Sequence, residues 1–253
     1  NERIAHIKDG VALTKFICWL KKNVGKIPIT ELSAGEKLYS FRAQQENFID
    51  NSFDPIISYG IHAAINHYSA TSETDIAIEP GNFLLADTGG HYYEGTTDTT
   101  RTIVMGSVND EQKKYFTAVL RGMLNLGNAK FRYGCTGVNL DYLARGPLWE
   151  MGQDFNHGTG HGVGYLLSVH EAPNAIRYRI MKNPELNPVF EPGMITSNEP
   201  GVYLEGEFGI RIENLVLCEK KEQNQWGTFL CFKPLTLVPY DRELISFEDM
   251  ADK

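Results

Sequence analysis

Residues 156–164 have glycine at every second position from Gly158 onward, and this pattern limits the possible secondary structure more than any other feature of the sequence. Gly158, Gly160, Gly162 and Gly164 argue strongly against a helix, although two histidines in this stretch stand four residues apart. We therefore expect extended backbone, which lets another part of the chain or a ligand come close and lets each imidazole be aimed separately.

Three of the seven histidines lie within or just after this stretch, at His157, His161 and His170. A lone histidine is usually a polar residue satisfied by its own surroundings, and that remains one interpretation. Three histidines in such a setting also predict a functional site, for instance one that binds a metal ion. Such a site needs further ligands, and the carboxylates that could serve lie in two other stretches.

Each half of the chain contains a hairpin-like segment that carries two carboxylates. In the first half an apolar strand runs into Asp87, and β-branched residues surround Asp98. In the second half a Pro-Gly turn signal separates Glu199 from Glu213. This arrangement hints at a duplicated architecture. The alternative interpretation of Asp87 is that it forms a turn beside two glycines.

Together with His161, these four carboxylates form an oxygen-rich set of ligands that suits Mn²⁺, Co²⁺ or Zn²⁺ better than a thiolate centre does. Four carboxylates that converged without cations would repel one another and shift toward their neutral forms. Two divalent ions would remove that repulsion and, about 3.5–4 Å apart, could share a hydroxide that is nucleophilic near neutral pH. Spacing alone does not show that the five residues meet.

Hydrophobic periodicity predicts the secondary structure around these stretches. Helices are expected over residues 2–24, 33–46, 109–131 and 138–150, the second opened by a capping box at Ser33. Strands are expected over residues 56–59, 61–65, 83–87, 97–102, 194–214 and 229–239, with polar loops at 177–192 and 219–222. His62 and His67, an odd number of positions apart, would point to opposite faces of a strand, so at most one of them faces any single site.

Composition narrows the class of protein. The chain has 253 residues, 42% hydrophobic and 22% charged, as is ordinary for a soluble globular protein, and no linker-like composition divides it, so we expect one α+β domain. A net charge of −8 argues against a nucleic-acid or anionic-membrane surface, and no apolar run approaches the roughly 20 residues that span a bilayer. Four cysteines without a CxxC pair indicate reduced thiols in the cytosol.

Six sequence blocks together resemble the signature motifs of the pita-bread metallopeptidases, which include aminopeptidase P, prolidase, methionine aminopeptidase and creatinase. The blocks are Asp87–Gly89, Thr97–Thr102, His157–Gly164, Val169–Pro173, Asn198–Gly201 and Gly209–Asn214. They follow the family's order and span nearly the whole chain. The resemblance implies the α+β pita-bread (creatinase/aminopeptidase) fold, in which two pseudo-symmetric halves form a curved, mostly antiparallel sheet flanked by helices.

The resemblance also implies a role for each motif residue. Two divalent metal ions, with Mn²⁺ favoured and Zn²⁺ or Co²⁺ as alternatives, would be bound by Asp87, Asp98, His161, Glu199 and Glu213. Glu199 would also accept and donate protons, while His67 and His170 would hydrogen-bond the substrate and the developing oxyanion. His157, Tyr203 and Arg211 would contact the substrate around its proline. The glycines beside His161 would then leave room for a peptide lying across the metals.

Within the family, the closest resemblance is to the long cytosolic type of aminopeptidase P, carried by Thr30–Ala34, Asn66–Tyr68 and Phe232–Pro239 beside the histidine motifs. It implies a dinuclear-metal aminopeptidase that hydrolyses the N-terminal Xaa-Pro bond of peptides through a metal-bridging hydroxide. The partner would be a peptide with proline at its second position, not a nucleic acid or a membrane, and the enzyme would be a cytoplasmic homodimer. Because relatives of this type carry additional N-terminal domains, residues 1–253 would be the catalytic, C-terminal domain of a longer protein.

Other functions on the same fold stay open as alternatives. Prolidase shares these ligands but cuts only Xaa-Pro dipeptides, and methionine aminopeptidase fits the histidine blocks less well. A non-catalytic peptide-binding module is the more distant alternative, because such modules have lost metal ligands and all five ligand positions are filled here.

Overall fold

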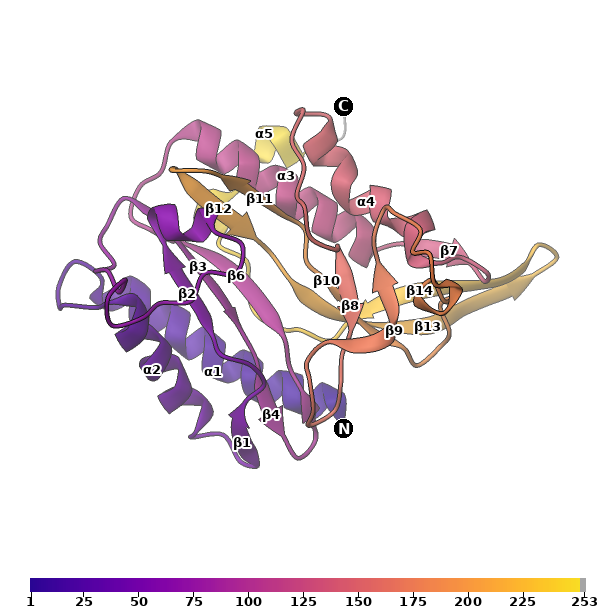
Figure 1. Cartoon of the computed structure of the whole chain (residues 1–253), viewed down its shortest axis with the longest axis horizontal. Helices are drawn as coiled ribbons and strands as arrows, with labels where there is room; N and C mark the ends of the chain where they lie inside the picture. Colours follow the sequence, from indigo (N-terminus) through magenta and orange to yellow (C-terminus); the bar gives the residue numbers. More distant parts are fainter. Residues whose placement is uncertain (251–253) are drawn as a thin grey trace.

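Two halves of similar build face each other across the centre of the molecule. The computed structural model describes residues 1–250, and Figure 1 shows the first half in indigo and purple and the second in rose to yellow. Each half places a pair of helices outside its strands, so the strands of the two halves meet in the middle. The strand pairs among residues 1–250 are antiparallel, in agreement with the mostly antiparallel sheet that the resemblance implied.

The first half packs two helices against a three-stranded sheet. Helices α1 (Glu2–Asn23) and α2 (Glu31–Arg42) cover the sheet of order β2-β3-β6, formed by Ile56–Tyr59, Asn82–Thr88 and Thr99–Met105. Their contact is a buried core, to which the helices give Leu13, Phe16, Leu20 and Leu38 and the sheet gives Leu84, Ala86 and Ile103. Each buried leucine, isoleucine or phenylalanine contributes about 1.5–3 kcal/mol on burial, which fixes the helices on this face.

The second half repeats the plan with a larger sheet. Helices α3 (Asp110–Gly127) and α4 (Gly137–Trp149) pack on six strands in the order β7-β14-β13-β10-β8-β9. In chain order these strands are β7 (Lys130–Arg132), β8 (Gly160–Gly162), β9 (Glu171–Ile176), β10 (Ile195–Asn198), β13 (Asn214–Asn224) and β14 (Gly227–Pro234). The predicted inner face of α3, from Phe116 to Leu126, is buried as expected.

A strand, a small hairpin and a second strand recur in both halves. In the first half β3 leads to the hairpin β4 (Gly90–Tyr92) and β5 (Gly95–Thr96), and then to β6. In the second half β10 leads to β11 (Gly201–Leu204) and β12 (Phe208–Arg211), and then to β13. Asp87 pairs with Thr100 across β3 and β6, and Asn198 pairs with Asn214 across β10 and β13. The duplicated architecture inferred from the carboxylate spacing is therefore present.

The middle of the glycine-rich stretch, Gly160–Gly162, is extended as predicted and forms β8. The reason for the glycines differs from the expected clearance for a peptide substrate. A Cβ at Gly160 would collide with the carbonyl oxygen of Ser197 on β10, and one at Gly162 with the carbonyl oxygen of Glu171 on β9. The glycines thus allow neighbouring strands of the protein itself to approach β8 closely.

The first two helices form where expected, but their details differ from the predictions. Ile4, Ile7 and Val11, which carried part of the periodic pattern of α1, are 43–52% exposed. The buried face of this helix instead includes Asp9, which is paired at 2.7 Å with the buried Arg42. The capping box of α2 begins at Thr30, with Ser33 as its third helical residue, so the predicted cap at Ser33 was three residues late.

Three segments adopt a different structure from the one predicted. Residues 61–65, expected as a strand, lie mostly in the short 3-10 helix η1 (Gly60–Ala64). Phe131, expected at the end of a helix, belongs to strand β7. The predicted hairpin loop at 219–222 is the outer part of β13, and the long β13–β14 hairpin projects at the right of Figure 1. Cross-strand pairing, which local pattern does not contain, decides the last two.

The contact between α3 and α4 depends on a glycine, which gives a test of the packing. A Cβ at Gly122 would collide with the carbonyl oxygen of Ala144, so Gly122→Ala should lower the free energy of unfolding by about 1–3 kcal/mol through overpacking. At Gly127, in the same helix, the nearest atom would be Asn198 Nδ2 at 3.5 Å, and Gly127→Ala should be neutral or slightly stabilising. Urea unfolding followed by circular dichroism measures both, and equal stability of the two variants would contradict the proposed close contact.

Candidate metal centre

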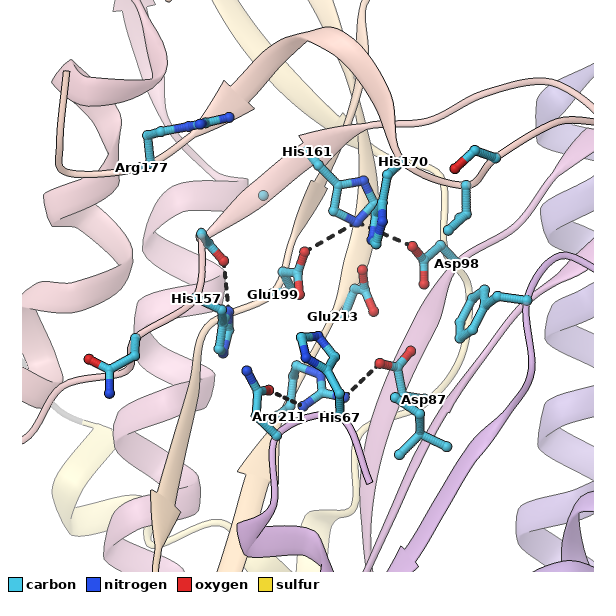
Figure 2. Close-up of a pocket in the computed structure, with 18 of the residues that line it drawn as sticks. His67, Asp87, Asp98, His157, His161, His170, Arg177, Glu199, Arg211 and Glu213 are labelled. Carbon is cyan, nitrogen blue, oxygen red and sulfur yellow. Dashed lines mark hydrogen bonds and ion pairs between the residues drawn. The ribbon is translucent and has the colours of Figure 1, made fainter. Parts of the chain in front are cut away.

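The four predicted carboxylates converge on one cavity. Asp87 lies in β3 and Asp98 immediately precedes β6, while Glu199 immediately follows β10 and Glu213 immediately precedes β13. Both strand–hairpin–strand units thus deliver two carboxylates at equivalent positions. All four line a cavity of about 690 Å³ whose walls come from both halves (Figure 2).

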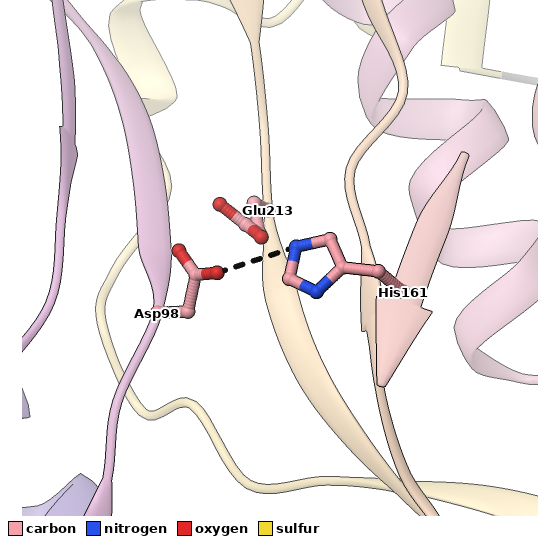
Figure 3. Close-up of side chains that lie close together, drawn as sticks. All are labelled: Asp98, His161 and Glu213. Atoms are coloured by element: carbon pink, nitrogen blue, oxygen red, sulfur yellow. Dashed lines mark ion pairs between the residues drawn. The ribbon is translucent and has the colours of Figure 1, made fainter. Parts of the chain in front are cut away.

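His161 joins these carboxylates from the neighbouring strand β8. Its Nε2 lies 3.3 Å from Glu199 Oε1 and 3.5 Å from Asp98 Oδ2. One ligand atom each of Asp98, His161 and Glu213 lies within 4.8 Å of the others, close enough to hold one ion (Figure 3). His161 Nδ1 is 2.9 Å from the carbonyl oxygen of Gly162, to which it donates when Nε2 is left free for a metal.

Hydrogen bonds from neighbouring hydroxyl groups orient two of the carboxylates. Thr100 Oγ1 donates to Glu213 Oε2 at 2.7 Å, across the boundary between the two halves. Ser197 Oγ donates to Glu199 Oε1 at 2.9 Å and also accepts the backbone N–H of His161 at 2.9 Å. Ser197 therefore fixes Glu199 and His161 relative to each other, as outer-sphere groups do at metal sites.

Burial and mutual repulsion disfavour the charged form of the two central carboxylates. The pKa of Asp98 lies well above its usual range because the side chain is desolvated and because Asp87 and Glu199 are close. The pKa of Glu213 is raised well above 4.5 for the same reasons, burial first and then the charges of Asp98, Glu199 and Asp87. Divalent cations at this point would offset both effects, because they favour the charged forms of the carboxylates.

One oxygen of the site is left without a partner. Asp87 Oδ2 accepts a hydrogen bond from Arg211 Nη2 at 2.6 Å, whereas the buried Asp87 Oδ1 has none within the part of the chain that the structure describes. A buried carboxylate oxygen is rarely left unsatisfied. This free oxygen, the imidazole and the three other carboxylates fit a site for two divalent ions, with oxygen ligands that suit Mn²⁺, Co²⁺ or Zn²⁺.

The predicted substrate-contacting residues form a hydrogen-bonded row beside the carboxylates. Arg211 Nη1 donates to the hydroxyl oxygen of Tyr203 at 2.7 Å, and that hydroxyl lies 2.9 Å from His157 Nε2. Burial raises the pKa of Tyr203 to about 12, and burial lowers the pKa of His157. Burial by itself would lower the pKa of Arg211, but Tyr203, Asp87 and Glu199 raise it well above its usual range. At neutral pH this row is therefore a cation, a neutral phenol and a neutral imidazole.

The other two predicted histidines also line the cavity. His67 and His170 lie on either side of the carboxylates in Figure 2, and the ring of His170 is 4.2 Å from that of His161. Burial, and next the proximity of His161, lowers the pKa of His170, so it is neutral at neutral pH. His62 does not line the cavity, in agreement with the prediction that at most one of His62 and His67 faces any single site. The predicted reason was wrong, because His62 lies in a 3-10 helix and not in a strand.

Several residues of the site were missed by the sequence analysis. Arg101 is fully buried, and its guanidinium donates to the carbonyl oxygen of Glu213 at 2.6 Å and to Asn214 Oδ1 at 2.8 Å. An arginine inside a run of threonines and apolar residues was the available signal. Further wall residues come from loops without a recognisable motif and include Phe53, Arg177, Tyr178 and Met181.

With this geometry established, comparison with known proteins identifies the family. Residues 1–220 match the model of metallopeptidase family M24. The chain belongs to this family, which confirms the resemblance to pita-bread metallopeptidases and the predicted fold. No helix among residues 1–250 combines the length and the apolar character needed to cross a membrane.

Individual relatives point to aminopeptidase P within the family. A probable Xaa-Pro aminopeptidase P of Metarhizium robertsii is 43% identical over 248 residues, covering 96% of this chain and 40% of that protein. Xaa-Pro aminopeptidase 1 of Dictyostelium discoideum is 43% identical over 249 residues, covering 96% and 39%. The resemblance to aminopeptidase P found in the motifs is thereby confirmed, and the chain spans about two fifths of the length of these relatives.

Solved structures agree with this placement. The X-prolyl aminopeptidase of Caenorhabditis elegans, described as a cytosolic enzyme with a di-nuclear active site, superimposes with a TM-score of 0.91 at 36% identity. The match covers 99% of this chain and 40% of that one. The prolidase of Pyrococcus furiosus superimposes with a TM-score of 0.74 at 29% identity, covering 94% of this chain and 65% of that one.

The repulsion within the site predicts an unusual gain of stability on removing a charge. The folded pKa of Glu213 is raised, so its contribution to stability is complete below the unfolded pKa of about 4.5 and is lost as the pH rises toward the folded value. At pH 7 the metal-free Glu213→Gln variant should therefore be more stable than the metal-free wild type by at least about 1 kcal/mol. The difference in stability should shrink at pH 4, where Glu213 of the wild type is neutral, as the glutamine of the variant is at every pH.

Urea unfolding in a chelator at both pH values measures this effect. Added Mn²⁺ should reverse the order at pH 7, because the variant has lost a carboxylate that fits the metal. Glu205→Gln, at an exposed position, serves as the control and should change little under any condition. A metal-free Glu213→Gln variant that is less stable than the wild type at pH 7 would overturn the electrostatic account of the site.

Proposed function

We propose that this chain is the catalytic part of an Xaa-Pro aminopeptidase, a metallo-exopeptidase that removes the first residue of peptides with proline at the second position. The observation that carries the proposal is the convergence of four carboxylates and one imidazole on a single cavity in a chain of family M24. The 43% identity with proteins named Xaa-Pro aminopeptidase supports the choice of substrate class.

Asp87, Asp98, His161, Glu199 and Glu213 would hold two divalent ions. Bound there, such ions supply a nucleophile at neutral pH and polarise the carbonyl group of the scissile bond. The distances around His161 Nε2 and the unpartnered Asp87 Oδ1 support this assignment of ligands. Mn²⁺ is the favoured ion because the set is rich in carboxylate oxygen, with Zn²⁺ or Co²⁺ as alternatives.

Glu199 would also move the proton that hydrolysis requires. When the peptide bond breaks, the nitrogen of the proline ring must gain a proton to leave as a secondary amine. Glu199 lies on the wall of the cavity, and its Oε1 is already oriented by Ser197. A carboxylate so placed can accept a proton from the attacking water and pass it to that nitrogen.

His67 and His170 would bind the reacting part of the substrate. Both lie on the wall of the cavity, and the lowered pKa of His170 keeps its imidazole neutral, with one N–H to donate. A donor aimed at the carbonyl oxygen stabilises the negative charge that develops on it as the carbon becomes tetrahedral. His157, Tyr203 and Arg211 would form the wall against which the proline ring lies.

The chemistry of the Xaa-Pro bond explains why a dedicated site is useful. Proline has no backbone N–H, so an enzyme that binds its substrate as a β-strand loses one hydrogen bond there. The residue before proline is also restricted in its backbone angles. A site that recognises a free amino terminus and a ring avoids both requirements.

We also propose the finer properties that these relatives imply. A cytoplasmic location is supported by the cytosolic Caenorhabditis elegans relative and by four cysteines that are all free. Additional domains before this one are supported by the two fifths of the relatives' length that the chain spans. A homodimer is supported by exposed aromatic side chains on one surface, where Trp149 packs against Tyr142 and Tyr178.

Peptide length separates the proposed activity from that of a prolidase. With added Mn²⁺, the protein should release the first residue from Xaa-Pro peptides of three and more residues, because the cavity extends beyond the carboxylates to Arg177 and Met181. Turnover of peptides with two, three and five residues, followed by chromatography of the released amino acid, measures this preference. Cleavage of dipeptides alone would favour prolidase. Failure to take up Mn²⁺, Co²⁺ or Zn²⁺ at neutral pH would favour a non-catalytic binding module.

The ligand role of His161 has its own test. His161→Ala should abolish hydrolysis of an Xaa-Pro peptide and lower the number of bound ions, because the imidazole is the one nitrogen ligand of the set. Circular dichroism should be unchanged, since His161 is half-buried at the cavity wall and the backbone of β8 does not depend on its ring. His91→Ala, at a half-buried histidine away from the cavity, is the matched control. Substantial residual activity of His161→Ala at saturating metal would contradict the role.

A further inference from the structure

A fully buried carboxylate lies behind the segment that carries His67. Glu31 is the first residue of helix α2, and its side chain is 0% exposed. It belongs to neither the candidate metal ligands nor the wall of the cavity. A carboxylate removed from water in this way must be saturated with hydrogen-bond donors.

All of its donors come from one short segment, residues 59–68. The backbone N–H of Tyr59 donates to Glu31 Oε1 at 2.7 Å. The hydroxyl of Tyr68, which also lies 3.1 Å from the carbonyl oxygen of Thr74, donates to Oε2 at 3.0 Å. His62 Nδ1 lies 3.0 Å from both oxygens and supplies the third donor. The rings of His62 and Tyr68 stack at 4.2 Å, so the two side chains reach the carboxylate together.

The same segment presents its other side to the cavity. Asn66 and His67 line the cavity wall, immediately before Tyr68 in the chain, and His67 points toward the carboxylates in Figure 2. Asn66 Oδ1 accepts a hydrogen bond from Arg211 Nη1 at 3.4 Å. Asn66 and His67 thus lie in the chain between His62 and Tyr68, the two side chains that bind Glu31, so a movement of one set moves the other.

The segment is also confined from the opposite direction. η1 packs against β12, and a Cβ at Gly209 would collide with the carbonyl oxygen of Ala63. The backbone is therefore held between helix α2 on one side and the strand that carries Arg211 on the other. Glu31 binds both ends of this span, at Tyr59 and at Tyr68.

We propose that Glu31 is a positioning residue that sets the location of His67 in the active site. This inference rests on the proposed function, in which His67 contacts the substrate. Three donors from ten residues can meet one desolvated carboxylate in only one arrangement of the segment, because any shift leaves a buried charge with an unpaired oxygen. Glu31 acts through the segment and touches neither metal ligands nor substrate.

The test replaces Glu31 with its neutral isostere. Glu31→Gln keeps the size of the side chain but replaces one acceptor oxygen by an NH₂ group, which faces the donors of His62 and Tyr68. In the Mn²⁺-loaded protein kcat/KM for an Xaa-Pro tripeptide should fall at least tenfold, toward the roughly 10²-fold loss of an ångström-scale misplacement. Bound metal should be unchanged. Glu36→Gln, at an exposed position of the same helix, is the matched control and should keep wild-type activity.

Hydrogen exchange supplies a readout that does not depend on activity. The backbone amides of residues 60–70 should exchange faster in Glu31→Gln than in the wild type, while those of β3 and β13 should not change. Tyr68→Phe removes a single donor and should give a smaller change of the same kind, so it carries the test if Glu31→Gln does not fold. Unchanged exchange in this segment would overturn the proposal.

A double-mutant comparison shows whether Glu31 acts through His67. In a His67→Ala background, Glu31→Gln should lower kcat/KM by less than threefold, because the group it positions is already absent. Full additivity of the two losses would overturn the proposal. If instead the wild type itself cleaves no Xaa-Pro peptide, the proposed function fails, whereas the exchange experiment still decides whether Glu31 orders the segment.

Discussion

Repulsion among four converging carboxylates, two of them buried, is the constraint on which this structure depends. Asp98 and Glu213 are almost fully buried, and the pKa of each is raised by this burial first and then by the neighbouring negative charges. The protein itself places two guanidinium groups nearby, Arg211 on Asp87 and Arg101 behind Glu213. Two cations among four acids leave an excess of negative charge, and divalent ions are the natural means of removing it.

The paired architecture delivers these acids without long loops. In each half the two strands that flank a short hairpin pair with each other, so their hairpin-side ends supply all four carboxylates. β8 adds the imidazole from between β10 and β9, where Gly160 and Gly162 let the neighbouring backbones come close. The precision of the site therefore comes from the register of the sheets, supported by hydrogen bonds such as that between Thr100 and Glu213.

The sequence predicted those parts in which local chemistry and local structure agree. The helices from Glu2 and Asp110, the extended glycine stretch and the two carboxylate hairpins are present. The prediction from the sequence was wrong where contacts with residues distant in the chain determine the local structure. Residues 61–65 have a strand-like pattern but lie mostly in η1, which packs against β12 and β3. In α1 the hydrophobic Ile7 is exposed, whereas the charged Asp9 is buried and is satisfied there by Arg42.

By itself, the sequence determined the family and the five residues whose chemistry suits a pair of metal ions, because those side chains recur in recognisable blocks. Only the tertiary structure decided which atoms meet: that His161 Nε2 faces Asp98 and Glu199, that Asp87 Oδ1 is left without a partner, and that Arg101 lies behind Glu213. Glu31 belongs to this second group. Its importance follows from burial and from three donors brought together by folding, and neither can be inferred from a glutamate at the start of a helix.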